Sequence, residues 1–256
     1  SVENPQYRGG GGNGYPFVVG TQESLYDSLR GINGRHNFTI TGQRASGNVI
    51  YRGYIANPIN SLPADFHAYL SMANLIDNLT IDKDRFDAAD RSSSAGVAGF
   101  PKHGVTTTQS VFWNNEGLSY RPDRPAIIRS DQYGWGYVIG TRGPAFRVAL
   151  EVNARTEPRD YLEGEGLGAT LQPQSLYVDQ LKRRLLREGK ADVWETIAEE
   201  LTPPPIKEWE AVEPQGLRRS TEPDLPLIHR EDFESASAGD LPEGWQPLRA
   251  SHSPHL

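Results

Sequence analysis

The chain has 256 residues, a formal net charge of -7 from 26 basic and 33 acidic side chains, and no cysteine. The lack of cysteine excludes disulfides, thiolate catalysis and Cys-ligated zinc within the chain. The acidic balance argues against nucleic acid as the main partner, and no apolar run is long enough to predict a membrane-spanning helix.

The N-terminal sequence SVENPQYRGGGGNGYPF has no basic segment followed by an apolar one, so it lacks the layout of a secretion signal. Its composition is that of a loop. We therefore interpret the chain as a mature form or an excised fragment of a longer protein.

Short strand-like segments recur along residues 1–152. One kind begins at Leu25, Val49, Leu75, Val111 and Tyr137, and a second kind (PFVVGT, NFTITG, HAYLSM, GVTTTQ) precedes each of the first four. We expect two short strands in each period of roughly 25 residues, with an insertion at residues 82–102 in the longest step. This insertion is either a surface loop or one wall of a substrate cleft.

Unequal spacing of this kind distinguishes between all-β architectures. A β-sandwich requires turns at shorter, regular intervals, and a propeller requires about four strands in each ~40 residues. A right-handed parallel β-helix tolerates insertions, because they leave the stack of coils as loops. The predicted fold is therefore an all-β solenoid, a right-handed parallel β-helix with C-terminal helices.

The composition changes after residue 152. The sequence PQSLYVDQLKRRLLREG, from Pro173, and the sequence ADVWETIAEEL, from Ala191, have helical patterns, so residues 153–202 are predicted to form a helical extension or cap. Residues 203–226 are rich in proline and charge and are predicted to form a linker. Residues 227–256 are predicted to be the start of an incomplete β domain or a disordered tail.

Four segments carry a family resemblance: NLIDN, KHGVTTTQSVFWN, GWGYVIGT and PQSLY. Together they resemble bacterial secreted proteins with a pectate-lyase-like right-handed β-helix, which include polysaccharide lyases and hydrolases. The resemblance covers about residues 15–190, and the tail DFES…GDLPEGW is similar to the opening of lectin-like β-sandwich modules. It implies a polysaccharide partner and a secreted or periplasmic location. No residue matches a catalytic motif of the family.

Three of the six histidines, His36, His67 and His103, stand at or just before the second kind of strand. In stacked coils about 4.8 Å apart, equivalent positions would form a row. Imidazoles that are neutral near pH 7 suit proton transfer. The alternative is that the row only packs, as like residues do along a solenoid.

Polar and aromatic residues accompany the predicted row. Asp65 and Tyr69 flank His67, and strand alternation places Tyr69 on its face. The same alternation places Thr107 and Gln109 with His103. We assign catalysis to His67, His103 and Tyr69. The residues expected to bind substrate are Arg35, His36, Lys102, Thr107, Gln109, Trp113 and Trp135.

Metal binding has only a weak signal in the sequence. The chain contains no HExxH or EF-hand motif, and Asp82, Asp84 and Asp87 are the candidates for Ca²⁺. We therefore expect no cofactor and assign no metal ligand.

The predicted function is cleavage of a uronate-containing polysaccharide by β-elimination, carried out by a monomer. This reaction needs a base, a cation beside the uronate carboxylate and a groove for several sugars. A glycoside hydrolase on the same scaffold and a non-catalytic, glycan-binding or structural solenoid remain as alternatives.

Overall fold

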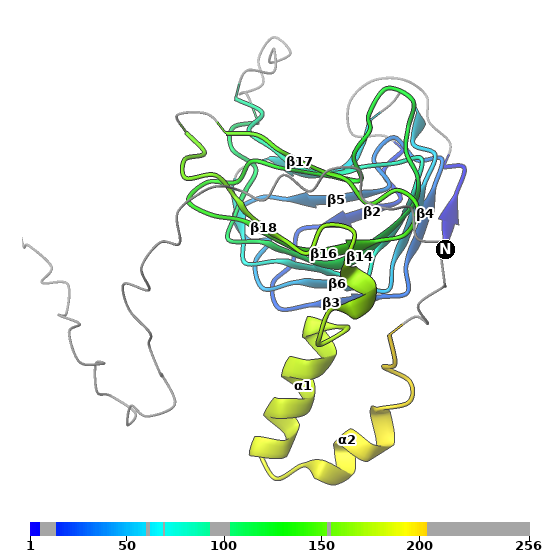
Figure 1. Cartoon of the computed structure of the whole chain (residues 1–256), viewed down its shortest axis with the longest axis vertical. Coiled ribbons are helices and arrows are strands. Elements are labelled where there is room, and N and C mark those ends of the chain that lie inside the picture. The colour runs from blue at the N-terminus through cyan, green and yellow to red at the C-terminus, as the bar shows by residue number, and fades with distance from the viewer. Residues whose placement is uncertain (6–13, 60–61, 69, 93–102, 153–154, 204–256) are drawn as a thin grey trace, which may run out of the picture. The chain divides into compact units, whose positions relative to one another are not determined.

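The computed structural model describes residues 1–5, 14–59, 62–68, 70–92, 103–152 and 155–203 (Figure 1). All of these residues belong to one unit, Ser1–Val212. The predicted segment 227–256, and residues 204–226 of the predicted linker, lie outside the described residues. No helix in the described part is long and apolar enough to cross a membrane.

The largest sheet, sheet A, is parallel in every strand pairing. In register, Leu25 pairs with Val49, Val49 with Leu75, Leu75 with Val111, and Val111 with Tyr137, so the predicted strand starts form one row. The strands are β1 (Val2–Glu3), β3 (Leu25–Asp27), β4 (Arg30–Ile32), β6 (Val49–Tyr51), β7 (Tyr54–Ala56), β10 (Leu75–Asp77), β11 (Thr80–Asp82), β14 (Val111–Ser119), β16 (Tyr137–Arg142) and β18 (Tyr161–Glu163).

A second parallel sheet, sheet B, contains one strand from each successive repeat. Its strands are β2 (Phe17–Val19), β5 (Phe38–Thr41), β8 (Ala64–Ala68), β12 (Phe86–Ala88), β15 (Ile128–Ser130) and β17 (Val148–Leu150). A small sheet C pairs β9 (Ser71–Met72) with β13 (Thr107–Thr108). In Figure 1, β5 and β17 of sheet B lie on the opposite side of the strand stack from β3 and β6 of sheet A.

Each repeat contains more strands than the two predicted from the sequence. A residue with positive φ interrupts the sheet A segment in three repeats: Ser28 (57°), Arg52 (52°) and Asn78 (56°). A left-handed residue turns the chain, so one predicted strand becomes a pair such as β6 and β7. Two of these residues are not glycine or asparagine, which explains why the sequence pattern did not reveal the turns.

The core lies between sheets A and B. Phe66 and Phe86 from sheet B contact each other and Phe112 from sheet A, with ring centroids 5.5 to 6.1 Å apart. Ile50 and Ile76, from the inner face of sheet A, are also fully buried. Burial of these branched and aromatic side chains favours strands over helices.

The C-terminal helices α1 (Leu176–Arg187) and α2 (Ala191–Ile197) follow a short 3₁₀ helix, η2 (Gly168–Thr170). Ser175 caps α1 by accepting a hydrogen bond from the Val178 amide. The buried Asp77 of β10 accepts hydrogen bonds from the Ser175 hydroxyl (2.7 Å) and the Tyr177 amide (2.8 Å). The start of α1 is therefore attached to the side of sheet A.

The structure is thus β-rich, with parallel sheets and two short C-terminal helices, and this arrangement is compatible with a parallel β-helix. The sheet extends past the predicted boundary at residue 152, because β18 pairs with β16.

Candidate functional site

The three predicted histidines form a row of rings beside sheet B. The ring centroids of His36 and His67 are 5.1 Å apart, and those of His67 and His103 are 4.7 Å apart. The backbone positions of His36 and His67 are not equivalent, however, whereas His67 and His103 keep the offset of the paired strands β9 and β13. Strand β5 pairs with β8 through Thr39 and Asp65, so His36 precedes the paired residue whereas His67 follows it, next to a bulge. The rings of His36 and His67 therefore meet because of the directions in which the two side chains extend.

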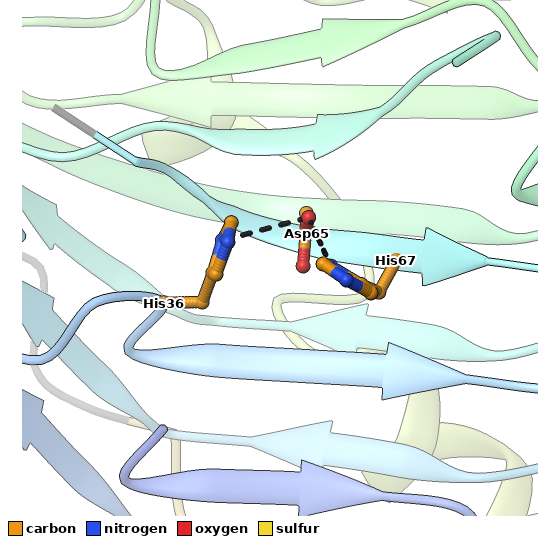
Figure 2. A group of neighbouring side chains, drawn as sticks. All are labelled: His36, Asp65 and His67. Atoms are coloured by element: carbon orange, nitrogen blue, oxygen red, sulfur yellow. Dashed lines mark hydrogen bonds and ion pairs between the residues drawn. The ribbon is translucent and has the colours of Figure 1, made fainter. Parts of the chain in front are cut away.

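Asp65 lies between the imidazoles of His36 and His67, as Figure 2 shows. Its Oδ2 atom is 2.9 Å from Nδ1 of His67 and 3.5 Å from Nδ1 of His36. Asp65 and His67 are both on β8, where their i and i+2 positions point to the same face. Local strand geometry thus builds the Asp65–His67 pair, which we call the dyad.

The dyad defines a tautomer for His67. An ionised carboxylate only accepts hydrogen bonds, so the Nδ1 atom that faces Asp65 carries the proton. Nε2 is then the basic nitrogen. The His67 side chain is 17% exposed whereas that of Asp65 is 3% exposed, so the ring is the member of the dyad that solvent or substrate can reach.

Asp65 is held as a carboxylate by its neighbours. Its burial alone would raise its pKa, but the hydrogen bond from His67 and the electrostatic interactions with His36, His67 and Arg91 outweigh burial, and the pKa is lowered. The Nη1 atom of Arg91 donates to Asp65 Oδ2 at 2.7 Å. The same nitrogen lies 3.0 Å from Nδ1 of His67, because both nitrogens contact the same oxygen of Asp65.

The pKa values of the other two imidazoles are lowered. Burial lowers the pKa of His36, against the opposing effect of the Asp65 charge, and its Nδ1 contacts the carbonyl of Pro63. Burial also lowers the pKa of His103, and the positive charges of Arg91 and His67 lower it further. His36 is 2% exposed, so its place in the row is an internal one.

Tyr15 and Arg35 complete the row. The Tyr15 ring meets His36 and His67 edge-on, with centroids 5.1 and 5.8 Å apart. The Arg35 guanidinium lies over the Tyr15 ring at 5.4 Å. Arg35, predicted as a substrate-binding residue, is therefore part of the cluster, and Tyr15 joins it although the sequence contained no signal for it.

A cavity of about 160 Å³ opens beside the dyad. Its lining combines His36 and Asp65 with arginines from several elements. The full lining is His36, Leu62, Pro63, Asp65, Arg85, Asp87, Ala89, Arg91, Arg124 and Arg129. The arginines are distant in sequence, and the pairing of β8 with β12 and of β12 with β15 brings them together.

The remaining predicted residues lie elsewhere. Thr107 is fully buried, and its hydroxyl donates to the Ser71 carbonyl at 3.0 Å. Gln109 is exposed, so the expectation that it shares a face with Thr107 is wrong; its positive φ of 52° breaks the alternation. Tyr69 and Lys102 lie outside the described residues.

The two predicted tryptophans differ in their surroundings. Trp113 is on sheet A, where its Nε1 donates to the Pro173 carbonyl at 3.0 Å. Trp135 is 52% exposed, and its carbonyl accepts a hydrogen bond from the amide of Gln109. Of the two, Trp135 has the open ring surface that a sugar would stack on.

The weak calcium candidates do not converge. Asp82 bonds Ser119, Asp84 is buried against Asn37, and Asp87 pairs with Arg85. The described group with metal-ligand spacing is instead His36, Asp65 and His67, whose ligand atoms lie within 4.8 Å of one another. Imidazole and carboxylate ligands suit zinc or iron. The guanidinium of Arg91 already contacts two of these residues, which disfavours a cation there.

Comparison of the chain with protein-family models, curated proteins and solved structures finds no match. The resemblance to pectate-lyase-like proteins therefore depends on the quoted sequence segments and on the parallel sheets.

Proposed function

We propose that the repeats are coils of a parallel β-helix and that the protein cleaves a uronate-containing polysaccharide by β-elimination. The observation that carries this proposal is the Asp65–His67 dyad, in which a buried carboxylate orients a partly exposed imidazole. Such a pair supplies a positioned general base with a defined tautomer.

In the proposed reaction, Nε2 of His67 removes the C5 proton of the uronate. The electron pair of that C–H bond forms a double bond between C4 and C5, and the C4–O bond breaks. We assign the proton that the leaving oxygen needs to the phenol of Tyr15, whose ring contacts both His36 and His67. The Asp65 carboxylate stabilises the imidazolium that forms.

Arg35 and Arg91 are the cations beside this row. A guanidinium next to the uronate carboxylate favours loss of the C5 proton, because it offsets the negative charge that builds up on the carboxylate. Arg91 also holds Asp65, so it connects the carboxylate of the dyad with the substrate-binding face.

A glycoside hydrolase is the second candidate, because Asp65 pairs in register with Asp87 across β8 and β12. Adjacent carboxylates of this kind serve retaining hydrolases. The general acid of such a pair needs a raised pKa, whereas that of Asp65 is lowered. Beside this sheet, burial raises the pKa of Asp84 to about 7 and that of Asp131 to about 6, and both side chains are buried. The geometry therefore favours elimination.

The test is product chemistry. The full chain is incubated with polygalacturonate, alginate and glucuronate-containing polymers, and both the ultraviolet absorbance of unsaturated uronates and new reducing ends are followed. Elimination produces both signals, and hydrolysis produces reducing ends without the absorbance. If neither signal appears on any polymer, the lyase proposal is wrong and a glycan-binding role takes its place.

A further inference from the structure

The cavity beside the dyad carries more positive charge than its acidic residues balance. Four arginines line it (Arg85, Arg91, Arg124 and Arg129), against two carboxylates, Asp65 and Asp87. His36 is left out of this count, because burial lowers its pKa. The lining therefore has an excess of two positive charges in a confined space.

Both carboxylates in the lining are already engaged by the other two arginines. Asp87 accepts two hydrogen bonds from the guanidinium of Arg85, through Nε and Nη2. Asp65 is held by Arg91 and His67. The excess positive charge thus belongs to Arg124 and Arg129.

The acidic partners of Arg124 and Arg129 do not line the cavity. The ion pair that Arg124 makes in the described structure is with the half-exposed Asp123, at 3.6 Å, and the charge of Asp87 also acts on Arg124. Arg129 contacts Glu151 at 2.7 Å and Asp131 at 3.4 Å, both through Nη2. The buried Nε atom of Arg129 has no hydrogen-bond partner among the described residues. Burial, followed by the charge of Arg85, lowers the pKa of Arg124, and the charges of Asp87 and Asp123 oppose this effect.

The position of the cavity relates it to the dyad. Across sheet B, Asp65 pairs with Asp87, and Asp87 pairs with Arg129. Arg129 is therefore two strand spacings from Asp65, about 10 Å at ~4.8 Å for each spacing. A glycan that lies across the strands would place another of its sugars near Arg129 when the sugar being cleaved is at His67.

From these observations we infer that Arg124 and Arg129 form an anion subsite for a carboxylate or sulfate ester on another sugar of the glycan that is cleaved. The inference rests on the proposed function for the position of the cleaved sugar. A volume of about 160 Å³ equals about five water molecules at ~30 Å³ each, which is enough for such a group. Guanidinium groups bind carboxylate and sulfate oxygens with two parallel hydrogen bonds.

Binding to the full chain tests this inference separately from turnover. The probes are polygalacturonate for carboxylate, dextran sulfate for sulfate and neutral dextran as the uncharged control. We expect the double variant Arg124→Gln/Arg129→Gln to bind at least one polyanion roughly tenfold more weakly than the parent chain, with a shallower dependence on salt. The matched control, Arg44→Gln/Arg159→Gln, removes the same charge from exposed positions that line no described cavity and should bind like the parent.

Equal weakening in both double variants would overturn the inference, because it would show that only net charge matters. Failure of the parent chain to bind either polyanion would overturn it too. Arg129→Lys, which keeps the charge but loses the paired hydrogen bonds, should bind with intermediate affinity even if the double variant does not fold. If the parent chain shows no turnover but its binding of a polyanion depends on Arg129, only the lyase proposal is contradicted. Normal turnover with unchanged binding in the double variant would contradict the subsite alone.

Discussion

Asp65 Oδ2 accepts the Nδ1 proton of His67 at 2.9 Å, and both residues come from the same face of strand β8. The substitution Asp65→Asn keeps the shape of the side chain but places a neutral amide beside the imidazole. We expect it to lower kcat by roughly 10²- to 10⁴-fold, the usual contribution of a positioned general base. Kinetics on the best uronate polymer measure this. An unchanged kcat would show that Asp65 does not orient the base.

The exposed ring of Trp135 should contribute to sugar binding, and Trp113 provides a matched control on sheet A. Trp135→Ala is expected to raise KM several-fold while leaving the melting temperature near that of the parent. Trp113→Ala removes packing and the hydrogen bond to Pro173, so it should lower the melting temperature by several degrees. The reverse pattern would contradict the assignment of Trp135.

Zinc binding should depend on Arg91. The Arg91 guanidinium contacts Asp65 and His67, so a cation has to displace it before using His36, Asp65 and His67 as ligands. We expect Arg91→Ala to bind Zn²⁺ at least about tenfold more tightly than the parent, and a second change, His67→Ala, to remove that gain. Equilibrium dialysis measures both. Equally tight binding by the parent chain would establish a metal site and require a different role for the dyad.

Asp77 should contribute a loss of stability as pH rises from about 4 to about 6. Burial raises the pKa of Asp77 to about 6, although the Tyr177 amide, Ser175 and Asn78 donate hydrogen bonds to it. The folded state therefore binds more protons than the unfolded state, whose Asp pKa is about 3.9. The difference between the two pKa values corresponds to about 3 kcal/mol in the free energy of unfolding. Asp77→Asn should remove this part of the pH dependence. The amide can also change the free energy of unfolding, but by the same amount at every pH.

Chemical denaturation at several pH values between 4 and 8 measures the free energy of unfolding for the parent and the variant. Asp84 and Asp131 also have raised pKa values, so the comparison of slopes isolates Asp77. Parallel curves for the two proteins would contradict the expected contribution of Asp77.

The repeat could be predicted from the sequence because apolar strand residues recur. Leu25, Val49, Leu75, Val111 and Tyr137 do stack in one row of parallel pairs. The division of each repeat into more strands could not be predicted, because residues such as Ser28 and Arg52 have no special tendency toward positive φ.

The site was predictable in part. The row of His36, His67 and His103 could be seen from the recurrence of histidine near one kind of strand. The cavity could not be predicted, because Arg124 and Arg129 come near Asp65 only through the pairing of strands that are distant in sequence. Tyr15 was missed for the same reason, since its neighbours come from later repeats.

The central claim is that His67 is the base of an elimination reaction. The most direct measurement compares the initial rate of unsaturated-uronate formation for the parent chain, His67→Ala and His103→Ala on one polymer. We predict that His67→Ala loses at least about a hundredfold in rate and that His103→Ala loses much less, because the hydrogen bond of Asp65 is to His67. Equal rates for His67→Ala and the parent, with both proteins folded, would contradict the claim.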